Sequence, residues 1–230
     1  MISDVGFTRF RDVLGTLPTD SPVVLLLRHA HRHDIPNGEV GTHVGLTPEG
    51  EHRATWLGQW LGARIVAVRS SPVGRCVRTA ECLLKGAGLN LGIVHDPLLG
   101  DPGCFSEQGD VAWQSFLTLG TEGVYLAQLQ NSQPLEGFRP THIGVDLLLS
   151  AVPDEMAPPG IHVWVTHDAI LGILLAACAK RTTLTPWPGF LEGLWLVRRG
   201  PEVRLIGYGL HLRRQLHGPD LDQDHRDDGE

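Results

Sequence analysis

The amino-acid sequence predicts an α/β fold, a three-layer sandwich in which helices cover both faces of a mainly parallel sheet. The run from Val23 to Leu27 is apolar at every position, as is typical of a central strand that is buried on both faces. Further along the chain, short β-branched runs alternate with helical patterns, which favours parallel strands joined by helices. We therefore expect a ligand site at the carboxyl ends of these strands, where open α/β sheets bind their ligands.

The first half of the chain carries clear start and stop signals for these elements. Thr47 has the properties of a helix N-cap, and Pro48 follows it at the first helical position. Pro72, after two serines, ends one strand and begins the next helix. In chain order, the patterns predict a helix over 3–17, a strand over 23–27, a helix from 48, a strand over 65–68, a helix after 72 and a strand over 91–95.

The second half of the chain predicts an insertion and a closing hairpin. Segment 97–151 opens with a strong turn signal and carries two helical patterns, 111–129 and 141–151, which we expect to lie over the pocket. A strand over 161–166, a helix over 169–179 and hairpin strands over 191–198 and 203–208 follow. The expected organisation is a single domain over 1–216 and an acidic tail, 217–230, which we expect to be disordered because it lacks aromatic residues.

The composition narrows the classes of function. The 230 residues carry a formal net charge of -7, which argues against nucleic acid as a partner, because nucleic-acid-binding proteins usually present a basic face. The four cysteines form no C-x-x-C pair, so their spacing indicates neither a zinc site nor a redox site. No signal peptide is visible and no apolar run is long enough to span a bilayer. We expect a cytoplasmic protein with no membrane partner, and the sequence predicts no oligomeric state.

Cationic and nucleophilic side chains follow three of the predicted strands. They are Arg28, His29 and Arg32 after the first strand, Arg75 after the second, and His167 with Asp168 after the fourth. Phosphoryl transfer needs cationic donors around the phosphate oxygens and a nucleophile in line with the leaving oxygen. Arginines bind phosphate oxygens in pairs, one imidazole can attack, a second can donate a hydrogen bond, and a carboxylic acid can protonate the departing alkoxide. The sequence therefore predicts a phosphoryl-transfer site that uses no metal and no other cofactor.

Four motifs, in this order along the chain, resemble motifs of the histidine phosphatase superfamily, also called phosphoglycerate-mutase-like. Arg28-His29-Ala30 is similar to the family's Arg-His-Gly, and Leu46-Thr47-Pro48-Glu49-Gly50 is similar to its Leu-Thr-x-x-Gly helix start. The segment from Ser70 to Arg75, with Thr79-Ala80, is similar to the segment that carries the family's second phosphate-binding arginine. Thr166-His167 is similar to the segment that carries its second catalytic histidine. The resemblance extends over most of the chain, from about residue 23 to 178. Alanine replaces the usual glycine at position 30, which keeps a small residue there.

The resemblance implies a phosphatase that hydrolyses a small phosphate monoester through a phosphohistidine on His29. It implies four phosphate-binding residues, namely Arg28, Arg32, Arg75 and His167. Arg78 competes with Arg75 for its role, because both lie on the same predicted helix. A phosphohistidine-protein phosphatase and a phosphomutase of the same superfamily are alternative activities.

The proton donor stays open between two carboxylic acids. Arg28-His29-x-x-Arg32 and His167-Asp168 resemble the acid phosphatase branch of the superfamily, whose aspartate is the donor. Asp101, in Leu99-Gly100-Asp101, falls where the mutase branch places its acidic donor. Because two features agree with the acid phosphatase branch, we favour Asp168 over Asp101.

Two other classes of protein are compatible with parts of the sequence. A metal-dependent hydrolase could use the alternating histidines His29, His31 and His33, because alternate side chains of an extended segment can converge on one ion. Arginines have no role in such a cationic site, however, which favours phosphoryl transfer. A binding module that recognises a phosphorylated partner without turnover is disfavoured, because every predicted catalytic group is present.

Overall fold

The computed structural model describes residues 13–36, 39, 41–100, 103–183 and 187–216. Three expectations therefore lie wholly or mostly outside the described residues. They are the helix over 3–17, Asp101 and the tail 217–230. Within the described chain, no helix is both long and apolar enough to cross a membrane.

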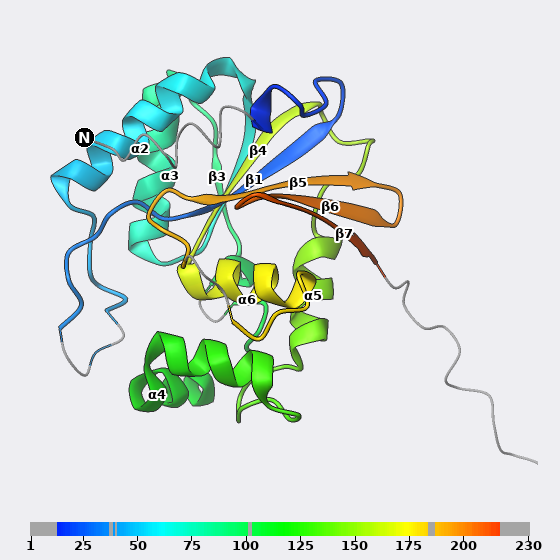
Figure 1. Cartoon of the computed structure of the whole chain (residues 1–230). Coiled ribbons are helices and arrows are strands. Elements are labelled where there is room, and N and C mark those ends of the chain that lie inside the picture. The colour runs from blue at the N-terminus through cyan, green and yellow to red at the C-terminus, as the bar shows by residue number, and fades with distance from the viewer. Residues whose placement is uncertain (1–12, 37–38, 40, 101–102, 184–186, 217–230) are drawn as a thin grey trace, which may run out of the picture.

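The core of the molecule is one seven-stranded sheet with the order β3-β2-β4-β1-β5-β6-β7 (Figure 1). Its strands are β1 (Pro22–Arg28), β2 (Ile65–Ser70), β3 (Ile93–His95), β4 (Gly160–Thr166), β5 (Gly193–Arg199), β6 (Glu202–Gly207) and β7 (Leu210–Gln215). The first four strands are parallel, as the sequence predicts, and β5 pairs antiparallel with β1. Since β6 and β7 continue as antiparallel hairpins, the sheet as a whole is mixed.

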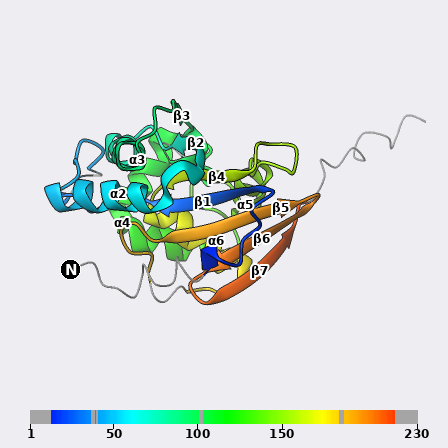
Figure 2. The ribbon, with the colours of Figure 1, turned by 90° about the horizontal axis from the view of Figure 1, so that it is seen from above.

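Helices cover both faces of this sheet, which confirms the three-layer sandwich (Figures 1 and 2). One face carries α2 (Pro48–Leu61), the short η1 (Gly62–Arg64) and α3 (Gly74–Ala87), and the other carries η2 (Pro97–Leu99), α4 (Gly109–Gln130), α5 (Thr141–Ser150) and α6 (Asp168–Cys178). Thr47 caps α2 as predicted, because its side chain accepts a hydrogen bond from the backbone N–H of Gly50.

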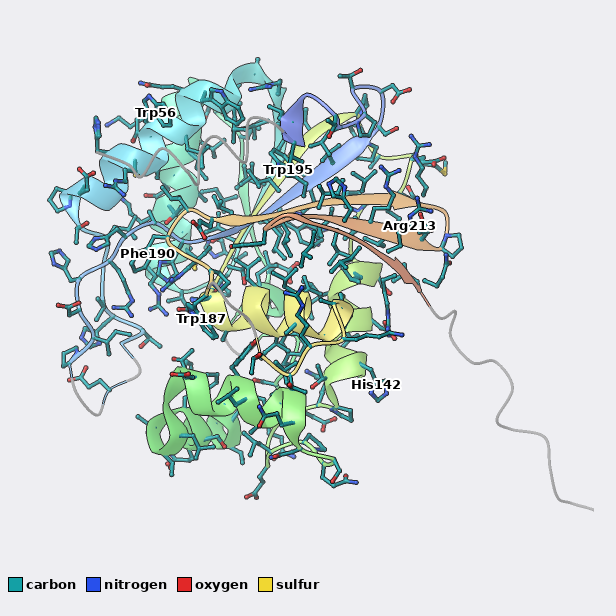
Figure 3. The ribbon with its side chains drawn as sticks, in the orientation of Figure 1. Trp56, His142, Trp187, Phe190, Trp195 and Arg213 are labelled. Carbon is teal, nitrogen blue, oxygen red and sulfur yellow. The ribbon has the colours of Figure 1, made fainter. Side chains whose placement is uncertain are left out.

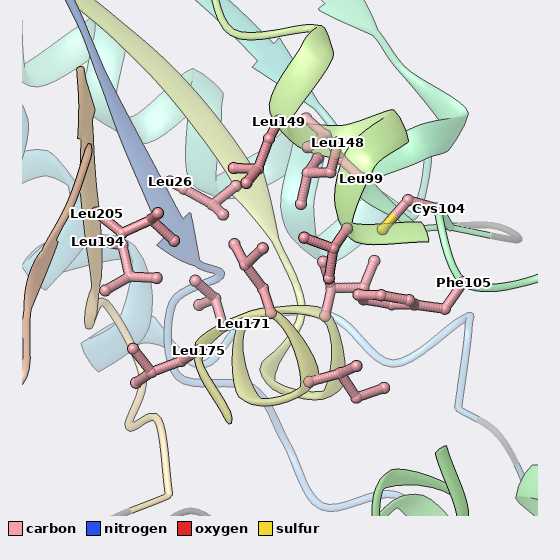
Figure 4. Packing of buried hydrophobic residues seen from close by; sticks show 14 of the residues in the cluster. Leu26, Leu99, Cys104, Phe105, Leu148, Leu149, Leu171, Leu175, Leu194 and Leu205 are labelled. Carbon is pink, nitrogen blue, oxygen red and sulfur yellow. The ribbon is translucent and has the colours of Figure 1, made fainter. Parts of the chain in front are cut away.

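Strand β1 supplies both halves of the hydrophobic core. Val24 and Leu26 face the cluster formed with α4, α5 and α6, while Val23, Leu25 and Leu27 face the cluster formed with α2 and α3. All five side chains are buried, as the continuous apolar run predicts for a strand covered on both faces. Figure 4 shows Leu26 among the leucines of α5, α6 and the antiparallel strands.

Strand β7 was not predicted from the sequence. Its side chains alternate between half-buried and exposed, a weak period-two signal in a short segment rich in charge. The turn that precedes it places Tyr208 and Gly209 at positive φ, 52° and 74°. Two such residues form the tight hairpin turn that matches the twist of the flanking strands, but tyrosine is not a residue that signals it.

The predicted helix over 111–129 is interrupted. Gly120 has φ 68° and ψ 175°, so α4 consists of two helical halves that meet at a break. The second half packs against α6, where Tyr125 lies beside Gly172, and its side chains Val124, Tyr125 and Gln128 are buried. The first half carries Trp113 and Phe116.

Candidate active site

The order of the strands brings the predicted chemical groups to one place. Since β2, β4 and β1 are neighbours in the sheet and run parallel, their carboxyl ends lie together. The chain continues this pairing beyond the strands, because the backbone N–H of His29 donates to Thr166 and that of Ser71 donates to Val165, each at 2.9 Å. His29, the amino end of α3 and His167 are thereby fixed relative to one another.

His29 is buried, with 2% of its surface exposed, and its two ring nitrogens have different environments. Nδ1 lies 2.8 Å from the carbonyl oxygen of Ala30, which can only accept, so Nδ1 carries the proton. Nε2 is then left with a free lone pair, and the Nε–H of Arg75 donates to it at 3.1 Å. This tautomer is the one in which Nε2 can act as a nucleophile.

Arg75 faces the site and Arg78 does not. The guanidinium of Arg75 reaches His29 through Nε and the carbonyl of Gly41 through Nη1, and its Nη2 lies 3.3 Å from Nδ1 of His167. Arg78 is instead held on the surface by ion pairs with Glu51 and Glu81. Of these two arginines, only Arg75 is placed to contact a ligand beside His29.

His167 is the N-cap residue of α6, and the centroid of its ring lies 5.5 Å from that of the His29 ring. The hydroxyl of Ser71 lies 3.0 Å from its Nε2 and 3.1 Å from the carbonyl of Gly100. Since the Gly100 carbonyl accepts the hydroxyl proton, Ser71 accepts from Nε2 of His167. Nδ1 of His167 is thus turned toward Arg75 and the space that a ligand would occupy.

Arg28 and Asp168 form an ion pair at the edge of the site. Nη2 of Arg28 lies 2.8 Å from Oδ2 of Asp168, and the arginine is further held by the carbonyl of Pro188 and by the ring of Phe190, 4.0 Å from its guanidinium carbon. Oδ1 of Asp168 accepts from the backbone N–H of Ala169, and Oδ2 also accepts from the indole of Trp187. Oδ2 therefore accepts from two donors and Oδ1 from one, so the carboxylate is held in its ionised form by Arg28 and by two N–H groups.

Two aromatic residues that contact this ion pair, Trp187 and Phe190, lie on the segment between α6 and β5 (Figure 3). The ring of Phe190 also contacts His29, with centroids 5.6 Å apart. Neither Trp187 nor Phe190 was predicted from the sequence as a site residue. No local pattern singles them out, because their contacts depend on how this segment returns to the sheet.

Ser71 and Thr79 are two further residues whose roles the sequence did not reveal. Thr79 accepts a hydrogen bond from the backbone N–H of Ala30 and donates to the carbonyl of Arg75, so it links the loop after β1 to α3. Both residues belong to the motif from Ser70 to Ala80, and their presence in that motif was the one available signal.

The close contact at Gly50 explains why the motif over 46–50 ends in a glycine. A Cβ atom at this position would lie 2.1 Å from the backbone oxygen of His31, so α2 starts in direct contact with the loop that follows His29. The backbone N–H of Thr47 also donates to the same oxygen. The helix start at 46–50 therefore holds the loop that carries Arg32.

Burial shapes the protonation of both histidines. The pKa of His29 is well below its usual value because the ring is buried and because His167 and two arginines lie nearby. Burial also lowers the pKa of His167, and Arg75 adds to the effect, while Asp168 opposes it. Without an anion in the site, both imidazoles are therefore neutral at pH 7.

A cavity of about 130 Å³ connects these groups. Its polar wall consists of Arg28, His29, Arg32, Arg75, His167 and Asp168, and the remaining lining comes from Ile35, Val73, Gly100, Trp113, Phe116, Thr121, Ala169 and Ile170. The first residues of α6, Asp168, Ala169 and Ile170, also line it, so the dipole of this helix favours an anion there. The five predicted site residues that lie at the ends of β1 and β4, together with Arg75, thus share one cavity.

Asp101, the second predicted proton donor, lies outside the described residues. The residue before it, Gly100, lines the cavity, and a Cβ atom there would lie 2.4 Å from the ring of His167.

The alternating histidines are not gathered as a set of metal ligands. His31 is exposed, with its Nδ1 2.9 Å from the hydroxyl of Thr47, and neither His31 nor His33 lines the cavity. Across the described part of the chain, no three His, Cys, Asp or Glu side chains are grouped so that they could hold a metal ion. This geometry gives no support to the alternative of a metal-dependent hydrolase built on His29, His31 and His33.

Comparison with protein families identifies one match. Residues 24–102 match the model of the histidine phosphatase superfamily (branch 1), a range that includes three of the four motifs and ends before His167. A search of the curated proteins finds no match.

Solved structures of similar fold cover most of the chain. YhfR of Bacillus stearothermophilus has 21% sequence identity and a TM-score of 0.57, and the match covers 82% of this chain and 97% of that one. A phosphoglycerate mutase from Bacillus anthracis has 18% identity and a TM-score of 0.51, covering 86% and 94% of the two chains. A phosphoserine phosphatase from Entamoeba histolytica, with 16% identity and a TM-score of 0.51, covers 81% and 95%. At these identities, the likeness concerns the fold.

Proposed function

We propose that the chain is a phosphatase of the histidine phosphatase superfamily, which hydrolyses a phosphate monoester through a phosphohistidine on His29. The observation that carries this proposal is the state of the His29 ring. Its Nδ1 proton is committed to the carbonyl of Ala30, its pKa is lowered by burial, and its Nε2 lone pair faces the arginine-lined cavity. A neutral imidazole with one free nitrogen aimed at an anion site is suited to attack on phosphorus.

Three arginines would hold the phosphate group. Arg75 would move its Nε–H from the lone pair of His29 to a phosphate oxygen, because the same lone pair is needed for the attack. Arg28 and Arg32 line the same wall, and the forked guanidinium groups can bind the equatorial oxygens in pairs. The dianion would also favour the protonated form of His167, which then donates to the phosphate through Nδ1.

The reaction would proceed in two displacements. In the first, Nε2 of His29 forms a bond to phosphorus while the bond from phosphorus to the alcohol oxygen breaks, and an acid gives that oxygen its proton. In the second, water attacks phosphorus, the bond to Nε2 breaks with its electrons returning to His29, and the conjugate base of the same acid takes a proton from the water. Inorganic phosphate leaves, and the enzyme returns to its initial state.

We infer that Asp101 is the acid and that Asp168 positions Arg28, which revises the preference drawn from the sequence. Both oxygens of Asp168 are occupied by donors from Arg28, Ala169 and Trp187. Asp101 follows Gly100, which lines the cavity beside His167.

A screen of phosphate monoesters, run with and without EDTA, tests the proposed function. We expect release of inorganic phosphate that survives the chelator and disappears in His29→Ala. Arg78→Ala is the matched control for Arg75→Ala, because both arginines lie on α3 but only Arg75 faces the cavity. Activity that EDTA abolishes and zinc restores would contradict the proposal, as would transfer of the phosphoryl group to a second alcohol without release of phosphate.

A further inference from the structure

The cavity around His29 has two chemically different walls. Its charged lining residues are Arg28, Arg32, Arg75 and Asp168, and all of them lie at the phosphate end. The other described lining residues are uncharged, and five of them are large and apolar, namely Ile35, Val73, Trp113, Phe116 and Ile170. A substrate would therefore place its phosphate against the arginines and the rest of its alcohol against this apolar wall.

The positive charges of the described lining are all committed to one phosphate group. Arg28 and Asp168 neutralise each other in their ion pair, so Arg32, Arg75 and the His167 that the bound dianion protonates remain as the net positive charges, and all three lie where the phosphate would bind. Among the described histidines, His29 and His167 line the cavity, whereas His31, His33, His43 and His52 do not. A second anionic group on the substrate would thus be desolvated without a partner from the described lining, which is costly.

The apolar wall is held in place by contacts between tilted aromatic rings. The ring of Trp113 lies 5.6 Å from that of Phe116, and Phe116 lies 5.8 Å from Phe138, which is buried in the main core. This chain of contacts connects the first half of α4 to the body of the protein. The wall is therefore preformed, and a bound apolar group would not have to pay for ordering it.

We propose that the substrate is a monophosphate ester of an uncharged alcohol that carries an aromatic or bulky apolar group, which packs against Trp113 and Phe116. This inference rests on the proposed function for the reaction, but the binding preference can be measured apart from turnover. Aromatic rings pair well in edge-to-face or offset geometry, and each buried apolar surface adds to affinity. The substrate class excludes phosphosugars and phosphorylated acids as preferred ligands.

Three non-hydrolysable phosphonates test the preference by calorimetry with the wild-type protein: benzylphosphonate, ethylphosphonate and 2-carboxyethylphosphonate. We expect benzylphosphonate to bind about tenfold more tightly than ethylphosphonate, since it buries more apolar surface. The carboxylate of the third ligand should bring no gain over ethylphosphonate. Tightest binding of the carboxylate ligand, or equal binding of all three, would overturn the proposal.

Variants of α4 assign the preference to the wall. Trp113→Ala and Phe116→Ala should each reduce the benzyl preference several-fold and leave the affinity for ethylphosphonate nearly unchanged. Leu117→Ala is the matched control, because Leu117 lies on the same half of α4 but is exposed and does not line the cavity. A benzyl preference that persists in both aromatic variants would place the apolar contact elsewhere and overturn the proposal.

Hydrolysis of benzyl phosphate and glycerol 2-phosphate separates this inference from the proposed function. Both are alkyl esters, so neither has the leaving-group advantage of an aryl phosphate. Hydrolysis of both with a preference for glycerol 2-phosphate would overturn the substrate class and leave the phosphatase in place. Benzyl-selective binding without hydrolysis of any ester would overturn the phosphatase alone, and no binding of any phosphonate would overturn both.

Discussion

The two histidines of the site differ in which ring nitrogen is committed to the protein. The Nδ1–H of His29 donates a hydrogen bond to the carbonyl of Ala30, whereas the Nε2–H of His167 donates one to the hydroxyl of Ser71. The sequence predicted both histidines as site residues from their positions after apolar strands. Their tautomers could not be predicted, because they depend on a local carbonyl orientation and on a serine from another strand end.

The roles of the two candidate acids, Asp101 and Asp168, can be tested with two kinds of substrate. An aryl leaving group such as p-nitrophenolate hardly needs a proton, whereas an alkoxide does, so loss of the acid slows alkyl phosphates selectively. We expect Asp101→Asn to slow benzyl phosphate by about a hundredfold or more and p-nitrophenyl phosphate much less. Asp168→Asn should slow both substrates by similar factors, because it releases Arg28 from its position. Steady-state kinetics of both variants on both substrates decide between the two roles.

The reverse pattern, with selective loss in Asp168→Asn, would restore Asp168 as the proton donor. Equal losses on both substrates in both variants would mean that neither aspartate is the acid.

At the scale of elements, the signals that succeeded were local. Caps, prolines and apolar runs predicted α2, α3, β1, β2 and β4, because each signal acts within a few residues of the element that it defines. The break of α4 at Gly120 was missed, since a single glycine within a helical pattern is compatible with a continuous helix. In the sequence, the apolar side chains of the first half of α4 are equally compatible with a place in the core, whereas in the structure Trp113 and Phe116 line the cavity.

The start of α2 offers a prediction that links an element to the site. Gly50→Ala would place a Cβ atom 2.1 Å from the backbone oxygen of His31, so the loop or the helix must shift. We expect lower stability and a loss of kcat/KM that remains at temperatures where the variant is fully folded. Gly45→Ala is the control, because a Cβ atom at Gly45 meets nothing within 4 Å. Thermal unfolding and kinetics measured on both variants check the expectation.

Unchanged kinetics in a folded Gly50→Ala protein would show that the contact between α2 and His31 supports the fold alone.

At the scale of the whole molecule, the sequence predicted which strand ends would meet but not what surrounds them. Parallel strands joined by helices place their carboxyl ends at one edge, so the convergence of His29, Arg75 and His167 follows from the predicted topology. The segment from α6 to β5 is different. Trp187 and Phe190 reach the Arg28–Asp168 pair through long-range contacts that no sequence pattern encodes.

The two buried histidines make the stability of the whole protein depend on pH. The pKa of each is lower in the folded chain than in the unfolded chain, so between the two values the unfolded chain binds more protons. Stability is therefore fully present above the unfolded value of about 6.5 and is lost as the pH falls below it, by up to about 1.4 kcal/mol per pH unit for each histidine. Urea unfolding at several pH values between 7.5 and 5, in buffers without phosphate, measures this loss.

The control separates these histidines from the general effect of acid. His29→Asn should flatten the dependence, whereas His142→Asn, at an exposed position of α5, should leave it unchanged. Stability that is constant or rises toward pH 5 in the wild-type protein would contradict the buried neutral state of the two rings.

The covalent role of His29 is tested most directly by trapping the phosphoenzyme. The wild-type protein is mixed rapidly with a radiolabelled phosphate monoester, quenched in alkali and digested, and the labelled peptide is identified by mass spectrometry. We predict label on the peptide that contains His29, stable to alkali and lost in acid as expected for a bond between nitrogen and phosphorus, and no label in His29→Ala. Label on any other residue, or turnover by His29→Ala at the rate of the wild type, would contradict nucleophilic catalysis by His29.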